Sequence, residues 1–132
     1  MNYLLDTHVL LWAINDDTKL SENVKERIKD IENSIFVSAI SFWEISLKFS
    51  LGKLKLKGFM PDDLTELSTK IGFKLIPLLH DVCGSYHHLI STIHRDPFDR
   101  MLIWQAIKQN YILITKDNKA NLYIGSGLKT LW

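Results

Sequence analysis

Cysteine is nearly absent from this chain, with Cys83 as the single example among 132 residues. One thiol cannot form an internal disulfide, and this is typical of a protein that works in a reducing compartment. It is also too little for a structural zinc site, and His87, His88 and His94 are too few and too poorly spaced to supply one. The sequence therefore excludes a disulfide-stabilised or zinc-folded domain.

A large excess of charge of one sign and a long apolar run are also missing. The formal net charge is +1, so we expect any contact with nucleic acid to be local, without a broad positive field. No apolar run approaches the roughly 20 residues of a membrane-spanning helix, and no basic leader precedes the first apolar run. We expect a cytoplasmic protein folded as one domain over residues 1–132.

Short apolar runs that alternate with helical patterns are what the sequence does contain. Five runs are too short for helices and predict strands, the last of them peripheral. They lie at 3–5, 35–37, 73–78, 111–115 and 128–132. Helical spacing of apolar residues is found over 7–15, 21–31, 38–52, 61–71, 81–89 and 98–109. This alternation predicts an α/β domain, with a central parallel sheet of four to five strands flanked by helices on both faces.

Acidic residues follow two of the predicted strands and open a predicted helix. Asp6 comes directly after the first apolar run, and Asp117 comes two residues after the run at 111–115. Ligands collect at the carboxyl ends of parallel strands, although either residue can instead cap the helix that follows. Asp96 precedes Pro97 at a helix start, where it is a natural cap, and Asp99 falls in the first helical turn.

Glu44 is unusual because it lies inside an apolar helix, between Trp43 and Ile45. A carboxylate there needs a partner, because burying an unpaired charge is costly. Lys48, four residues on, could pair with it, or the carboxylate could point at a functional cluster.

A parallel sheet could bring Asp6, Asp99 and Asp117 to one edge together with Glu44. Carboxylates that crowd together repel one another unless a cation neutralises them, and oxygen ligands select hard ions such as Mg²⁺ or Mn²⁺. Such an ion can activate water for phosphodiester hydrolysis. The hydroxyls of Thr7 and Thr115 could support that water or a ligand, or simply bond to the backbone.

Five segments of the chain, taken together, resemble a PIN-domain ribonuclease, and most closely the VapC-type toxins of bacterial toxin–antitoxin pairs. They are LDTH at 5–8, SAISFWEI at 38–45, GKL at 52–54, HRDPFDR at 94–100 and TKD at 115–117. The resemblance implies a parallel α/β fold and endoribonuclease activity supported by Mg²⁺ or Mn²⁺. It also implies a homodimer that a small antitoxin protein neutralises.

Position by position, the resemblance assigns the catalytic, metal-binding quartet to Asp6, Glu44, Asp99 and Asp117, with Asp96 as an accessory acid. In the mechanism that it implies, Asp6 and Asp99 hold the principal ion and Glu44 orients or shares its water. Asp117 completes the cluster. The ion offsets the charge that develops on oxygen during attack on the RNA phosphorus.

Basic residues near these acids are candidates for holding RNA phosphates. They are Lys48, Arg95, Arg100 and Lys116. The alternating segment at 53–57, a short edge strand or an extended loop, places Lys53, Lys55 and Lys57 on one side as a possible RNA track. Each of these charges could instead be an ordinary solvated surface group. The apolar residues around this segment, from Phe49 to Met60, either form a surface that a partner covers or pack as core.

Two other functions fit parts of the pattern. A phosphohydrolase could use Asp6 as its nucleophile. Such enzymes carry an Asp-x-Asp motif after the first strand, however, and this chain has His8 in place of the second aspartate. A non-catalytic interaction domain would use the acids only as helix caps and core pairs. Stabilisation by Mn²⁺ would distinguish a metal site from such a domain.

Overall fold

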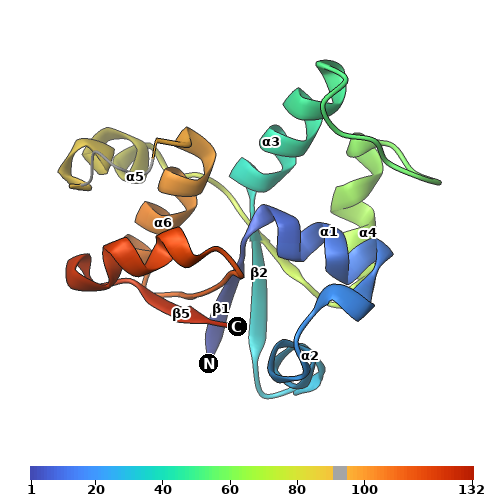
Figure 1. Cartoon of the computed structure of the whole chain (residues 1–132), viewed down its shortest axis with the longest axis horizontal. Helices are drawn as coiled ribbons and strands as arrows, with labels where there is room; N and C mark the ends of the chain where they lie inside the picture. The colour runs from blue at the N-terminus through green and yellow to red at the C-terminus, as the bar shows by residue number, and fades with distance from the viewer. Residues whose placement is uncertain (91–94) are drawn as a thin grey trace.

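A five-stranded parallel sheet forms the centre of the computed structural model, which describes residues 1–90 and 95–132. The strand order is β3-β2-β1-β4-β5, and every neighbouring pair is parallel (Figure 1). The strands are β1 (Asn2–Leu5), β2 (Ser34–Ser38), β3 (Lys74–Ile76), β4 (Ile112–Ile114) and β5 (Lys129–Leu131). This architecture confirms the α/β fold expected from the sequence, with the first strand in the middle of the sheet.

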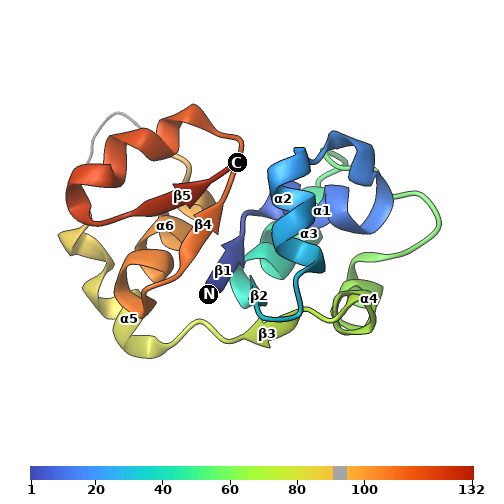
Figure 2. The ribbon, with the colours of Figure 1, turned by 90° about the horizontal axis from the view of Figure 1, so that it is seen from below.

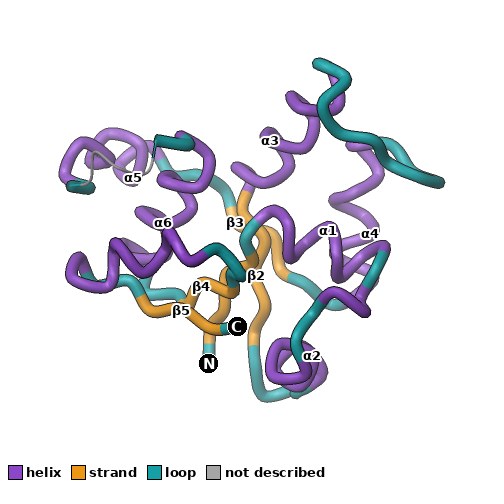
Figure 3. The backbone as a smooth tube through the Cα atoms, in the orientation of Figure 1, coloured by secondary structure: helices purple, strands orange, loops and turns teal. Residues whose placement is uncertain are grey.

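The helices agree closely with the predicted ones, as the tube in Figure 3 shows. The α-helices are α1 (Thr7–Asn15), α2 (Glu22–Lys29), α3 (Ala39–Ser50), α4 (Leu64–Ile71), α5 (His80–Ser85) and α6 (Pro97–Gln109). Short 3₁₀ helices are η1 (Asp17–Lys19), η2 (Pro61–Asp63), η3 (Tyr86–His88) and η4 (Asn118–Ser126). In the part of the chain that the structure describes, no helix is long and apolar enough to cross a membrane.

Two layers of helices cover the two faces of the sheet (Figure 2). Side chains alternate along β1, so that Tyr3 and Leu5 join a core cluster with α1 to α4, while Leu4 joins a second cluster with α5, α6 and η4. The same alternation in β4 sends Ile114 to the first cluster and Leu113 to the second. Period-two alternation therefore builds one core on each face of a sheet that is buried on both sides.

The alternating basic segment is a loop between α3 and η2, so the alternative of an edge strand is wrong. Its alternation still determines which side chains are buried. Leu54, Leu56 and Phe59 pack against the first core cluster, and the intervening lysines are exposed. Leu51 and Met60 at the ends of the loop remain exposed, so the packing interpretation is correct for part of this apolar material, and the covering partner stays a prediction for the rest.

Replacing Gly72 by alanine should destabilise the protein, because Gly72 ends α4 with a φ of +106°. Side chains disfavour that backbone conformation, and we expect the free energy of unfolding to fall by about 1–2 kcal/mol. Urea unfolding measures the change. Gly84→Ala is the matched control, because Gly84 has no positive φ and no atom within 4 Å of an added Cβ. Equal effects of the two substitutions would contradict the backbone argument.

Candidate acidic site

Asp6 occupies the junction at which β1 ends and α1 begins. One carboxylate oxygen, Oδ1, caps the helix by accepting hydrogen bonds from the backbone N–H of His8 (2.8 Å) and of Val9 (3.2 Å). The other, Oδ2, accepts a 2.6 Å hydrogen bond from the Thr115 hydroxyl. The residue is therefore a helix cap and, at the same time, a carboxylate held at the carboxyl end of the central strand.

Burial raises the pKa of Asp6 above its ordinary value. The hydrogen bonds from Thr115, Val9 and His8, and the charge of His8, act in the opposite direction but do not outweigh it. The folded protein thus disfavours the charged form of this carboxyl group. A cation bound nearby would favour that form, because an opposite charge lowers a carboxyl pKa.

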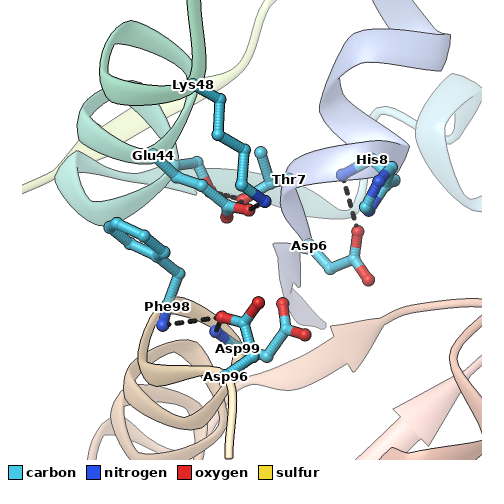
Figure 4. A network of polar contacts seen from close by, with 9 residues as sticks. Asp6, Thr7, His8, Glu44, Lys48, Asp96, Phe98 and Asp99 are labelled. Carbon is cyan, nitrogen blue, oxygen red and sulfur yellow. Dashed lines mark hydrogen bonds and ion pairs between the residues drawn. The ribbon is translucent and has the colours of Figure 1, made fainter. Parts of the chain in front are cut away.

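Glu44 is 2% exposed and makes the ion pair with Lys48 that its helical spacing allows. Its other oxygen accepts a 2.7 Å hydrogen bond from the Thr7 hydroxyl, which lies 3.0 Å from Ser41 Oγ. Figure 4 shows this carboxylate on α3, facing the gap that separates α3 from the start of α6. The structural pair is therefore present, and Lys48, the partner of Glu44, also feels the charges of Asp96 and Asp99.

Lys48 is the counter-charge of this region. Partial burial opposes its charged form, but the hydrogen bond and charge of Glu44, with the charges of Asp96 and Asp99, raise the pKa of Lys48 above its ordinary value. Its side chain remains 35% exposed. Lys48 therefore partly neutralises acids that belong to two different helices.

The remaining acids open helices on the second layer of the fold. Asp96 caps α6 by accepting hydrogen bonds from the backbone N–H of Phe98 (2.9 Å) and of Asp99 (3.1 Å), as Figure 4 shows. Asp117 caps η4 by accepting from Lys119 N at 2.9 Å, and its own N–H donates to Thr115 Oγ1. The capping predictions for Asp96 and Asp117 are therefore correct. His94, at the start of the motif at 94–100, lies outside the described residues.

Three of the four quartet acids line one cleft, with a volume of about 300 Å³, at the carboxyl end of β1 and β4. The lining consists of Asp6, His8, Trp12, Asp99, Lys116 and Asp117. A small adjoining hollow, which Thr115 also lines, lies under the same three acids. Glu44 faces this region from α3, but its carboxylate is bonded to Thr7 and Lys48.

The donor set of the cleft fits a hydrated hard cation. Among residues 1–90 and 95–132, no three acidic, histidine or cysteine side chains are close enough to hold an ion together. Mg²⁺ does not need such a cage, since it usually keeps several waters and binds one or two carboxylates. Asp6 and Asp99 can supply those two carboxylates from opposite sides of the cleft, one from each helical layer.

The predicted phosphate-binding residues fall into different environments. Lys116 lines the cleft, and Arg95 is exposed beside Asp96. The three loop lysines are exposed but are not among the residues that line the cleft. Their contact with RNA stays a prediction.

Arg100 has a structural role that the sequence did not indicate. Its guanidinium donates hydrogen bonds to the hydroxyls of Tyr86 (2.8 Å) and Tyr123 (2.9 Å) and to the carbonyl of Leu89 (2.9 Å). These bonds join α6 to η3 and η4, which favours a packing role over contact with RNA.

Sequence reasoning missed three residues of the site. His8 and Trp12 line the cleft, and Ser41 lies against the Thr7 hydroxyl beside Glu44. A usable signal existed for the first two, because positions 8 and 12 share one face of a helix that starts at Asp6. No sequence signal identified Ser41, since its contact with Thr7 joins residues 34 positions apart.

The chain is similar to known proteins in sequence and in fold. The family described as PIN domain matches residues 3–123. The chain is 25% identical over 129 residues to Ribonuclease VapC22 of Mycobacterium tuberculosis (strain ATCC 25618 / H37Rv), covering 98% of this chain and 97% of that protein. It resembles VapBC-1 from nontypeable Haemophilus influenzae with a TM-score of 0.71 at 20% identity, over 99% of this chain and 97% of that chain. It also resembles VapBC2 from Rickettsia felis bound to a DNA fragment from their promoter, with a TM-score of 0.68 at 20% identity, over 99% of this chain and 98% of that chain.

Removing Lys48 should expose the cost of burying Glu44. We expect Lys48→Met to lower the free energy of unfolding by about 2–3 kcal/mol, because it leaves a buried carboxylate without its cation. Adding Glu44→Gln to the same protein removes that charge and should restore part of the loss. Urea unfolding of the two single variants and the double variant measures the coupling. Strictly additive effects would mean that the ion pair contributes nothing to stability.

Proposed function

Since the chain belongs to the PIN-domain family, we propose that it is a metal-dependent endoribonuclease that acts as the toxin of a toxin–antitoxin pair. The observation that carries the proposal is the set of three carboxylates, Asp6, Asp99 and Asp117, on one cleft at the carboxyl end of the central strands. The similarity to Ribonuclease VapC22 supports RNA as the substrate. Such a toxin acts in the cytoplasm, where RNA and antitoxin are found.

In this proposal Asp6 and Asp99 hold Mg²⁺ or Mn²⁺, and Asp117 contributes directly or through water. When bound, the ion polarises the phosphate and lowers the pKa of water for attack on phosphorus. Glu44, held by the Thr7 hydroxyl and paired with Lys48, faces the cleft from α3 and would orient or share the water of that ion.

Asp96 and Thr115 are positioning residues in this mechanism. Asp96 fixes the first turn of α6, which carries Asp99, by accepting from two backbone N–H groups. The Thr115 hydroxyl holds one oxygen of Asp6, so that the carboxylate does not rotate away from the cleft. Lys116 is the best-placed cation for an RNA phosphate because it lines the same cleft, while Arg95 and the loop lysines at 53, 55 and 57 would contact more distant phosphates.

The antitoxin partner is supported by an apolar groove on the α3 side of the molecule. Its volume is about 630 Å³, and its lining includes Phe42, Trp43, Phe49 and Met60. Trp43 and Met60 are 60% and 52% exposed, which leaves apolar surface that a partner segment can cover. We place the antitoxin in this groove and, by family resemblance, expect the toxin to form a homodimer.

An aspartyl-phosphate mechanism is the competing enzymatic function. His8 stands where such enzymes carry a second acid, so Asp6 lacks the neighbour that would protonate the leaving group. Stoichiometric binding of beryllofluoride at Asp6 would favour that mechanism over ours.

Asp99→Asn should abolish both metal binding and RNA cleavage. We expect Mn²⁺-dependent cleavage of single-stranded RNA to fall by at least about a hundredfold, because the amide cannot neutralise the ion. The rise in melting temperature that Mn²⁺ gives the wild type should disappear as well. Asp17→Asn is the control, since Asp17 is exposed on η1 and outside the cleft. An unchanged Mn²⁺ response in Asp99→Asn would contradict the assignment of Asp99 as a ligand, and no response in the wild type would favour the non-catalytic interaction domain.

Met60→Asp should separate inhibition from catalysis. A charge placed in the apolar groove should weaken neutralisation by the antitoxin at least about tenfold, because the new carboxylate must lose its water when the partner binds. Cleavage by the free toxin should change little, since Met60 is not among the residues that line the acidic cleft. Titration of RNA cleavage with the antitoxin measures both quantities. Normal neutralisation of Met60→Asp would place the antitoxin elsewhere.

A further inference from the structure

The acidic cleft has a second wall of different chemistry. Trp12 and His8 lie on it from α1, with ring centroids 6.1 Å apart and planes tilted by 45°, and Lys116 joins them from the segment after β4. This wall shares the 300 Å³ cleft with Asp6 and Asp99. None of the three side chains is needed to hold an ion, so the mechanism above leaves most of this surface without a role.

The tryptophan on this wall is held in a fixed orientation. Trp132 contacts Trp12 edge to face, with ring centroids 5.9 Å apart, and its own carbonyl accepts a hydrogen bond from the Asn23 side chain. The Lys116 ammonium lies 5.9 Å from the centroids of both tryptophan rings. Trp12 is half-buried and packs against the first core cluster, while part of it lines the cleft. A ring fixed in this way can bind a flat partner without ordering itself first.

RNA gains from such a surface because the carboxylates of the cleft repel its phosphates wherever no cation lies between them. Asp6, Asp99 and Asp117 carry the charge sign of phosphate, and the net charge of the chain, +1, supplies no broad attraction. An aromatic face offers no hydrogen bond to phosphate. It does bind a nucleobase by stacking, which depends little on salt and on the identity of the base.

We propose that Trp12 and His8 form a nucleobase site that takes the base next to the cleaved phosphate. This inference rests on the proposed ribonuclease function and adds to it where the substrate's base binds. The base stacks on Trp12 beside the His8 imidazole, in place of the Lys116 ammonium that lies over the ring in this structure, and Lys116 turns to the phosphate of the same nucleotide. A cleft of about 300 Å³ lies at the lower end of the range for small-ligand sites, which suits one nucleotide better than a duplex.

Single-stranded RNA with abasic residues tests the site. The cleavage position of a short oligoribonucleotide is first mapped with the wild type and Mn²⁺, and each neighbouring nucleotide is then made abasic in turn. We expect one abasic position to lower kcat/KM of the wild type by about tenfold or more. In Trp12→Leu the same abasic position should have almost no further effect, because the two changes remove one interaction.

A fluorescence measurement provides a second readout that does not need catalysis. The base at that position, or each base in turn where no cleavage is found, is replaced by 2-aminopurine, whose emission falls when it stacks. Quenching should occur with the wild type and with Trp12→Phe, and should be lost with Trp12→Leu. Tyr111→Leu is the matched control, because it removes an aromatic ring that packs on Phe36 away from the cleft. Tyr111→Leu should quench the emission of 2-aminopurine as the wild type does.

The outcomes separate the two proposals. Wild-type protein that cleaves no RNA would overturn the ribonuclease function, while aminopurine quenching would still decide whether a base binds at Trp12. Cleavage with full abasic sensitivity and full quenching in folded Trp12→Leu would overturn the base site and leave the ribonuclease intact. Melting curves of each variant establish that it is folded.

Discussion

Carboxylates that repel one another are held at one edge of the sheet by hydrogen bonds from their own chain. Asp6 accepts from two N–H groups of α1 and from the Thr115 hydroxyl, and Glu44 accepts from the Thr7 hydroxyl. Both threonines lie within two residues of the end of a central strand. Sheet and site therefore depend on one another: the parallel strands bring the threonines together, and the threonines fix the carboxylates that the strands place side by side.

Helix capping does not exclude ion binding by the same residues. A capping aspartate uses one oxygen for backbone N–H groups, and the rest of its carboxylate stays available to other partners. Asp6 shows this division, with Oδ1 on α1 and Oδ2 toward Thr115, and Asp117 caps η4 while lining the cleft. Capping is therefore shown for both residues, while their binding of an ion stays a prediction that capping does not exclude.

Short apolar runs and helical periodicity were sufficient to predict the fold, because both faces of a parallel sheet must be covered and each strand is therefore apolar. Asp6, Asp96, Asp99 and Asp117 could be found because each one follows a strand or opens a helix. Glu44 could be found because a carboxylate is unusual inside an apolar helix. The sequence could not indicate Arg100 as a packing residue, since its partners Tyr86 and Tyr123 come from separate segments. It could not decide the state of the segment at 53–57 either, because alternation is equally compatible with a strand and with a loop lying on a core. Side-chain contacts between distant elements decide such points.

The division of the fold into two helical layers has a mechanical consequence. Asp6 belongs to the layer of α1, and Asp99 belongs to the layer of α6, on the other face of the sheet. An ion bound by both carboxylates would link the two helical layers. The free energy needed to separate the layers would then include the free energy of releasing the ion. Occupancy of the cleft would then govern how rigidly the two halves of the molecule move together.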